Sequence, residues 1–137
     1  MANTTILSDS KTLAYPDSKV FAYLSNFKNF QNILPAESVE NYSASDERCT
    51  FYLVGISELT LFISEKIKYT TITYQSENNP YQISLRVHLS AGSNNTCNCQ
   101  LELNAEFSKI IKLMAEKPLK SVLNKMLDKL AQLDFSV

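Results

Sequence analysis

The sequence has few of the features that mark secreted, membrane-spanning or nucleic-acid-binding proteins. It holds three cysteines in 137 residues, and this odd number without framework spacing favours free thiols in a reducing compartment. No basic start followed by an apolar run opens the chain, and no stretch approaches the roughly 18 to 20 apolar residues of a membrane span. A net charge of −1 provides no basic excess for a phosphate backbone. We therefore expect a cytoplasmic protein with no nucleic-acid partner and no stable membrane insertion.

Glycine is also scarce, because the chain contains only two, and other residues must make its turns. The remaining composition is that of an ordinary globular protein, with 45% hydrophobic and 20% charged residues. The sequence shows no internal repeat, low-complexity tract or linker. Its length fits one core but not two independent ones. We therefore predict a single domain over residues 1–137.

Most of the chain carries the pattern of β-strands. Apolar and polar side chains alternate from Tyr81 to Leu89 and from Cys97 to Phe107, so that one face of each strand is apolar. Bounded by turn-like segments, the predicted strands cover residues 4–14, 39–45, 48–54, 59–67, 69–76, 81–91 and 95–107. A shift of one residue between paired strands would turn an apolar face to solvent, so this alternation limits the register of the strands. We place Val87 opposite Cys99, Leu85 opposite Leu101, Tyr74 opposite Ile83 and Ile72 opposite Leu85.

Helical spacing appears in two places. Pro16 and Asp17 open a segment with apolar residues three and four positions apart, which predicts one or two short helices that end before Pro35. A second, longer pattern predicts a helix over residues 108–133, and it contains Pro118. A proline in a helix interior removes a backbone donor and costs about 3 kcal/mol. The coarse order is therefore a strand, short helices, six antiparallel strands and a long helix.

The apolar face of the long helix changes direction near Pro118. Ile110 and Met114 share a stripe with Pro118, whereas Leu123 and Leu130 follow a stripe rotated from it. We favour one kinked helix over two helices, because Lys117 would be a poor N-cap for the second. Pro118 could bend the helix around a filled core, or the helix could close an apolar cavity. The cavity is favoured because six or seven strands curled around one helix enclose more space than that helix fills.

Two segments resemble a known family over nearly the whole chain. The stretches "VFAYLSNFKNFQNILP" (Val20–Pro35) and "MAEKPLKSVLNKMLDKL" (Met114–Leu130), with the strand meander between them, resemble the START-like or SRPBCC superfamily. The matching residues are Phe21, Leu24, Asn29, Phe30, Leu34, Pro35, Lys117, Pro118 and Leu119. The resemblance implies an α+β helix-grip fold, in which a curved antiparallel sheet of six to seven strands wraps around the C-terminal helix. Members include polyketide cyclases, lipid carriers, hydrolases and chaperone-associated domains, so the fold alone does not fix an activity.

Few side chains are candidates for chemistry. His88 is the only histidine, and its parity places it on the solvent face beside Asn98, as a bystander. Cys97 and Cys99 point inward as core thiols, and we therefore expect neither a metal site nor a cofactor. Glu65 shares parity with inward residues and is a weak catalytic candidate, unless a bulge near it releases the carboxylate to solvent.

Tyrosines and lysines complete the candidates. Tyr69, Tyr74 and Tyr81 could offer hydroxyl groups to the polar head of a ligand, although such residues usually pack as core. The lysines of the last helix are expected on its solvated side, where acidic residues alternate with them.

We predict that the protein binds or carries a hydrophobic or amphipathic small molecule, lipid-like or polyketide-like, between the sheet and the long helix. The predicted ligand-binding residues are Leu61, Ile63, Ile72, Tyr74, Ile83, Leu85, Val87, Leu101, Leu103, Phe107, Met114, Pro118, Val122 and Met126. One alternative is a cyclase-like or hydratase-like enzyme that uses the same cavity, for which an inward Glu65 is the discriminating feature. The other is a protein-interaction module with a collapsed cavity, whose protein partner the sequence does not name.

Overall fold

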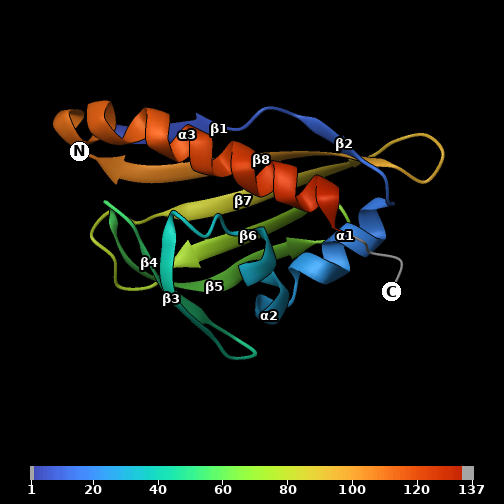
Figure 1. Ribbon diagram of the computed structural model, residues 1–137, viewed down its shortest axis with the longest axis horizontal. Helices are drawn as coiled ribbons and strands as arrows, with labels where there is room; N and C mark the ends of the chain where they lie inside the picture. The colour runs from blue at the N-terminus through green and yellow to red at the C-terminus, as the bar shows by residue number, and fades with distance from the viewer. Residues whose placement is uncertain (1, 134–137) are drawn as a thin grey trace.

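A computed structural model describes residues 2–133, which form one antiparallel sheet, two short helices, a 3₁₀ turn and a long C-terminal helix (Figure 1). The elements in chain order are β1 (Ala2–Leu7), β2 (Lys11–Leu13), α1 (Asp17–Leu24), α2 (Phe27–Phe30), the 3₁₀ turn Gln31–Ile33, β3 (Val39–Ala44), β4 (Cys49–Leu53), β5 (Ser57–Ile67), β6 (Thr71–Ser76), β7 (Ser84–Ala91), β8 (Cys97–Phe107) and α3 (Lys109–Gln132). This arrangement confirms the predicted α+β helix-grip architecture.

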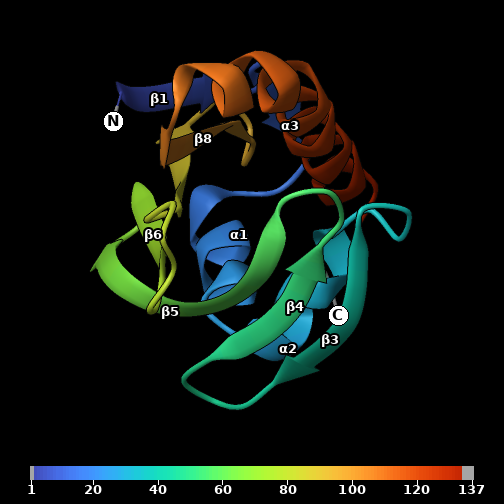
Figure 2. The ribbon, with the colours of Figure 1, turned by 90° about the vertical axis from the view of Figure 1, so that its left-hand side faces the viewer.

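The sheet curls strongly around the helices. Its strand order is β1-β8-β7-β6-β5-β4-β3, and β2 also pairs with β8, so that neighbours from β3 to β8 are consecutive in the chain. Figure 2, viewed from one end of the molecule, shows β3 and β4 folding round toward α3, which lies across the opposite side. The concave face of the sheet is therefore turned toward the helices, with α3 lying across it.

The first strand differs from the prediction, because two strands replace the single one expected over residues 4–14. The break falls at Ser8, whose amide donates to the carbonyl of Leu101 at 2.9 Å and whose hydroxyl accepts from the Leu101 amide at 2.9 Å. Since the Ser8 side chain takes a ladder position that backbone would otherwise fill, the edge strand bends there and resumes as β2.

The predicted registers of two hairpins are wrong by two residues. Val87 lies opposite Leu101 and Leu85 opposite Leu103, while Tyr74 lies opposite Leu85 and Ile72 opposite Val87. Both connecting loops are longer than the predicted registers allow, since the Gly92 amide donates to the Thr96 carbonyl across one and the Ser76 amide to the Ile83 carbonyl across the other. A shift of two residues keeps every side chain on its predicted face, so the inward and outward assignments survive.

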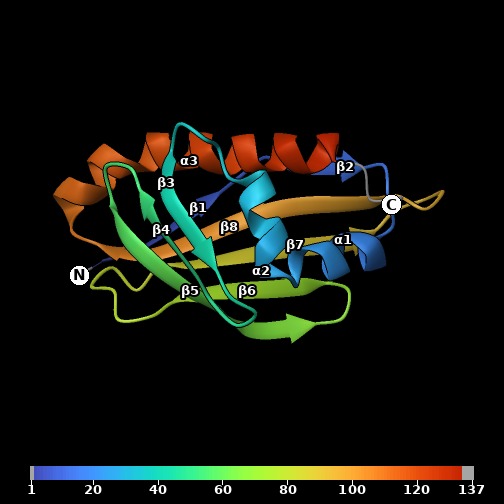
Figure 3. The same cartoon turned by 60° about the horizontal axis from the view of Figure 1, so that its bottom comes forward.

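Helices α1 and α2 occupy the concave side at one end of the sheet, as Figures 2 and 3 show. The Tyr74 hydroxyl on β6 donates to the carbonyl of Leu24 at the end of α1, and the Tyr42 hydroxyl on β3 donates to the Phe27 carbonyl at 2.5 Å. Burial raises the pKa of both phenols well above the usual value, so they stay protonated as donors. The two tyrosines thus fix the short helices to the sheet.

Helix α3 is continuous through Pro118, as predicted. Ser108 caps its first turn by accepting from the Ile111 amide at 3.3 Å. The first turns are inclined to the rest of the helix in Figures 1 and 3, in agreement with a bend near the proline. The buried residues of α3 are Ala115, Leu119, Leu123, Met126, Leu127 and Leu130. Its first turns instead carry apolar side chains in solvent, because Ile110, Leu113 and Met114 are 71%, 83% and 73% exposed.

Candidate ligand-binding groove

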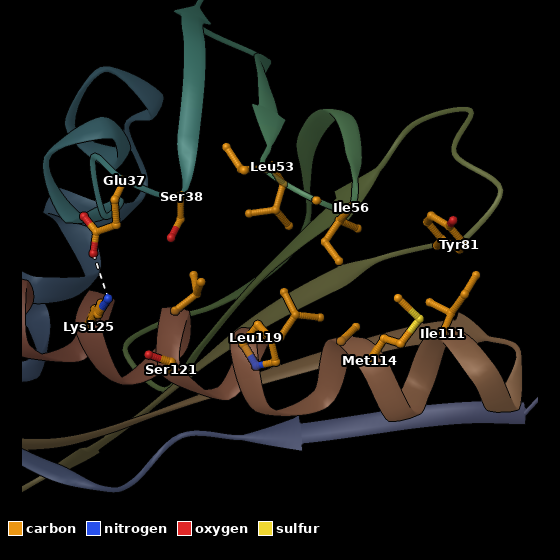
Figure 4. Close-up of a pocket in the computed structure, with 15 residues that line it drawn as sticks. Glu37, Ser38, Leu53, Ile56, Tyr81, Ile111, Met114, Leu119, Ser121 and Lys125 are labelled. Carbon is orange, nitrogen blue, oxygen red and sulfur yellow. Dashed lines mark hydrogen bonds and ion pairs between the residues drawn. The ribbon is translucent and has the colours of Figure 1, made fainter.

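A groove of about 530 Å³ lies between α3 and the β4–β5 hairpin. The side chains of Ile111, Met114, Pro118 and Val122 come from α3, and Leu53 and Ile56 come from the end of β4 and the turn that follows it (Figure 4). Gly55 in this turn has φ +81°, a conformation that residues with a Cβ atom rarely adopt. The glycine therefore allows the narrow turn that forms one lip of the groove.

Polar groups gather at the two ends of the groove. At one end the Lys125 ammonium donates to the Glu37 carboxylate at 2.8 Å, and the hydroxyls of Ser38 and Ser121 lie nearby (Figure 4). This hydrogen bond lowers the pKa of Glu37, so the carboxylate remains charged near neutral pH. At the other end Tyr81 packs its ring edge-on against Phe107, with centroids 5.2 Å apart. An apolar middle between polar ends suits an amphipathic molecule.

The interior beneath this groove is almost filled. A void of only about 40 Å³ remains between α3 and the sheet, and its lining includes Leu61, Leu85 and Leu103 together with aromatic rings from α2 and β4. A void of this size holds little more than one water molecule. The large cavity that we predicted deep in the grip is therefore not open in this conformation, and the groove of about 530 Å³ lies at its mouth.

Three residues belong to both hollows. Leu53 lines the groove and the void from β4, while Leu119 and Val122 do so from α3. Leu53 and Leu119 are buried, whereas Val122 is half-buried. These side chains form the layer that separates the groove from the interior, so a change in their rotamers would join the two spaces.

The predicted ligand-binding residues divide into four groups in the structure. Met114, Pro118 and Val122 line the groove, and Val122 also lines the void with Leu61, Ile83, Leu85, Leu103 and Met126. Ile63 lies at a separate surface depression near α2. The remaining residues are packed in the core and border neither the groove nor the void: Ile72, Tyr74, Val87, Leu101 and Phe107. Their part in binding stays a prediction.

Glu65 is not directed into the grip. The register of β5 shifts between Ile63 and Glu65, which is the bulge that the sequence left open as an alternative. The side chain is exposed and accepts a hydrogen bond from the Thr73 hydroxyl at 3.2 Å. Arg86 donates to the same hydroxyl at 3.1 Å. Glu65 thus belongs to the polar outer face of the sheet, and the feature that would favour an enzyme is not observed.

The structure places His88 on the outer face, as parity required, but beside Gln100 and not Asn98. Its Nε2 lies 2.8 Å from the Glu102 carboxylate, a contact that the sequence did not predict. The thiols of Cys49, Cys97 and Cys99 are free and buried in the core, in agreement with the prediction for the last two. Within residues 2–133, no group of three histidine, cysteine, aspartate or glutamate side chains is arranged to hold a metal ion.

Other tyrosine candidates lie apart from one another. The Tyr74 hydroxyl donates its hydrogen bond to the Leu24 carbonyl. Tyr69 is 42% exposed, and its ring packs edge-on against Phe21. Only Tyr81 reaches the groove. Nor is any described helix long and apolar enough to cross a membrane.

Sequence reasoning missed the half of the groove that does not come from α3. Glu37, Ser38, Val54, Gly55 and Ile56 lie in connecting segments, where no alternation indicates which side chains face a hollow. Gly55 was the one available signal, because a glycine in a chain so poor in glycine marks a required turn.

Comparison with solved structures identifies the class of the fold. Norcoclaurine synthase from Thalictrum flavum superposes with a TM-score of 0.73 at 13% identity, covering 96% of this chain and 92% of that chain. XoxI from Bacillus cereus gives 0.72 at 15% identity, with 96% and 94% covered, and an uncharacterised protein from Bacillus thuringiensis gives 0.70 at 14%, with 95% and 96% covered. One structure of the synthase holds dopamine and hydroxybenzaldehyde. No protein-family model and no curated protein matches the sequence.

These similarities, spread over almost the whole chain, show that the protein has the START-like helix-grip fold of the birch-pollen-allergen type. The resemblance noted in the sequence is thereby confirmed at the level of the fold.

Proposed function

We propose that the protein binds a hydrophobic or amphipathic small molecule in the groove between α3 and the β4–β5 hairpin, as a carrier or sensor. The observation that carries this proposal is the mostly apolar lining of the groove, whose volume of about 530 Å³ falls within the usual range for ligand sites of roughly 300–1,000 Å³. A neighbour of the same fold, norcoclaurine synthase, holds small aromatic molecules, which supports the proposal by analogy of fold.

The apolar middle of the groove would supply most of the affinity, at about 25 cal/mol per Å² of apolar surface buried. The polar end at Glu37 and Lys125 would orient a head group, because both side chains remain partly exposed and already form an ion pair. Longer ligands would displace Leu119 and Val122 and extend into the interior void.

A blocking substitution tests the proposal. Ser121 is exposed and lines the groove, so Ser121→Trp should fill the groove without disturbing the core, whereas Ala131→Trp adds the same ring to the far end of α3. Binding of a fluorescent fatty acid analogue should raise the melting temperature of the wild type and of Ala131→Trp, because a ligand bound to the native state stabilises it. Ser121→Trp should weaken binding by at least about tenfold, a loss near 1.4 kcal/mol. Equal binding by all three proteins, or no binding by the wild type, would contradict the proposal.

A further inference from the structure

The first turns of α3 expose an apolar face that shares only Met114 with the lining of the groove. Leu113 and Met114 lie three and four residues after Ile110, and Lys117 lies four and three residues after them, which places all four on the same side of the helix. The three apolar side chains are at least 71% exposed. Across the groove, Val54 is 46% exposed on the other lip. Exposed apolar residues on both lips indicate a contact surface around the mouth of the groove.

The same segment of the helix carries an excess of positive charge. Residues 109–120 contain four lysines and one glutamate, a formal charge of +3, although the whole chain carries −1. The rest of the sequence therefore holds nine basic against thirteen acidic residues. Among residues 2–133, none of the four lysines, Lys109, Lys112, Lys117 and Lys120, forms an ion pair. Their charge is free to meet an anionic partner.

We propose that the first turns of α3, residues 109–120, dock peripherally on an anionic lipid bilayer. Exposed Ile110, Leu113 and Met114 would enter the region between head groups and acyl chains, while the flanking lysines meet anionic head groups. Such docking lies in the plane of the interface and needs no membrane span. It would bring the mouth of the groove against the bilayer, where Met114 belongs to both the docking face and the groove.

A second copy of the chain is a poorer occupant of the same face. A two-fold symmetric contact would set the four lysines of one copy against the same four of the other, because both partners present the same patch. Like charges held together at an apolar contact oppose association. An anionic bilayer satisfies both the apolar side chains and the lysines.

Sedimentation with vesicles tests the proposal on the whole protein without any groove ligand. The wild type should bind vesicles with about a third of their lipid as phosphatidylserine, bind pure phosphatidylcholine at least tenfold less, and dissociate in high salt. Lys117→Gln with Lys120→Gln should lower binding by about fivefold for each lysine. Leu113→Asn should lower vesicle binding at least as much. Because the Leu113 side chain is 83% exposed, this variant should fold like the wild type, and circular dichroism checks that it does.

Ile67 and Lys68 provide matched controls at the other end of the sheet, where β5 turns into β6. Ile67 is 49% exposed and Lys68 is exposed, so Ile67→Asn and Lys68→Gln repeat the same chemistry away from α3. These variants should bind vesicles like the wild type. Failure of the wild type to bind anionic vesicles, or equal losses in the α3 and control variants, would overturn the proposal. So would concentration-dependent dimers that Leu113→Asn abolishes in analytical ultracentrifugation.

The docking proposal rests on the proposed function in one respect: docking would give an apolar ligand in the bilayer access to the groove. The two are separated by measuring binding of the fluorescent fatty acid analogue without vesicles. Leu113→Asn should keep this binding while losing the vesicles, and Ser121→Trp should show the reverse. Loss of both properties in Leu113→Asn, with circular dichroism unchanged, would show that the docking face is part of the ligand site and would overturn its separate role.

Discussion

The cysteine thiols in the core are kept unreactive by burial. Cys97 and Cys99 are 0% and 1% exposed, and burial raises the pKa of Cys97 above its usual value and that of Cys99 to about 12. Burial likewise raises the pKa of Cys49 to about 11. Since only the thiolate attacks, these thiols are inert as long as the core is closed.

We therefore expect slow labelling of all three cysteines by a thiol reagent at pH near 8 in the native protein and rapid labelling after denaturation. A Ser90→Cys variant provides the control, because Ser90 is exposed and its new thiol should react at once. Rapid native labelling of the wild-type cysteines would show that the core opens readily, contrary to their burial.

Glu102, on the outer face of the sheet, makes the stability of the folded protein depend on pH. The Asn104 amide donates to its carboxylate at 2.7 Å and His88 lies 2.8 Å from it, and these two contacts, the amide first, lower the pKa of Glu102 from 4.5. The group therefore binds a proton less readily in the folded than in the unfolded chain. Its contribution to stability is present above pH 4.5 and is lost as the pH falls through the lower folded-state value.

Glu102→Gln should lower the free energy of unfolding at pH 7 by about 1 kcal/mol and flatten the loss of stability below pH 4.5. Urea denaturation at several pH values measures both effects. Glu106→Gln, on the same strand, is the control, because the Glu106 carboxylate makes no hydrogen bond or ion pair with the described residues. The same pH profile in wild type and Glu102→Gln would contradict the assignment.

At the scale of elements, one buried hydroxyl joins α1 to the sheet in addition to the core packing of Val20, Phe21 and Leu24. Tyr74→Phe removes the donor that reaches the Leu24 carbonyl and leaves that carbonyl without its partner in the core. We expect a loss of about 1–3 kcal/mol in the free energy of unfolding, since a buried acceptor keeps its desolvation cost. Tyr69→Phe, at an exposed phenol, should change stability by less than about 0.5 kcal/mol. Equal effects in the two variants would show that the Tyr74 hydrogen bond contributes nothing specific.

Pro118 lies inside α3 where the helix lines the groove, and it removes one backbone donor there. Pro118→Ala restores the amide that can donate to the Met114 carbonyl and removes the ring from an exposed position. The free energy of unfolding should hold or rise by up to about 3 kcal/mol, while affinity for the fluorescent fatty acid analogue falls because the first turns of the helix shift.

Thermal melts with and without the analogue test both effects of Pro118→Ala. If the proline only fits α3 to a filled core, the variant should instead lose stability, and the wild type should show no ligand-dependent shift. That outcome would favour the interpretation of Pro118 as a packing feature and would contradict the groove.

For the whole molecule, the curved sheet and α3 share one core that runs from β1 to β4. The predicted single domain implies that this core unfolds cooperatively. We expect the far-ultraviolet and tyrosine near-ultraviolet circular dichroism signals to give coincident urea transitions with a common midpoint. Separate midpoints for the two signals would show that part of the chain, such as the β3–β4 edge, unfolds independently.

The sequence by itself determined the class of the fold and the faces of the residues in β7 and β8. Alternation in β7 and β8 and the three-and-four spacing in α3 depend on local geometry, which a short window of residues specifies. The same alternation left the strand register open, because a shift of two residues keeps every side chain on the same face of the sheet. The register was decided by the lengths of the loops at residues 77–83 and 92–96, which only the folded structure shows. Parity alone did not decide the direction of Glu65, where the bulge that the sequence allowed turns the side chain to the outer face.

Only the tertiary structure decided where the hollow lies. Large side chains such as Phe30, Phe51 and Met126 come from distant parts of the chain and fill the interior to a void of about 40 Å³. Volume left by packing is a sum over many non-local contacts, and no single segment encodes it. The groove and the exposed face of residues 109–120 likewise arise because α3 extends past the edge of the core, which its amphipathic pattern alone did not reveal.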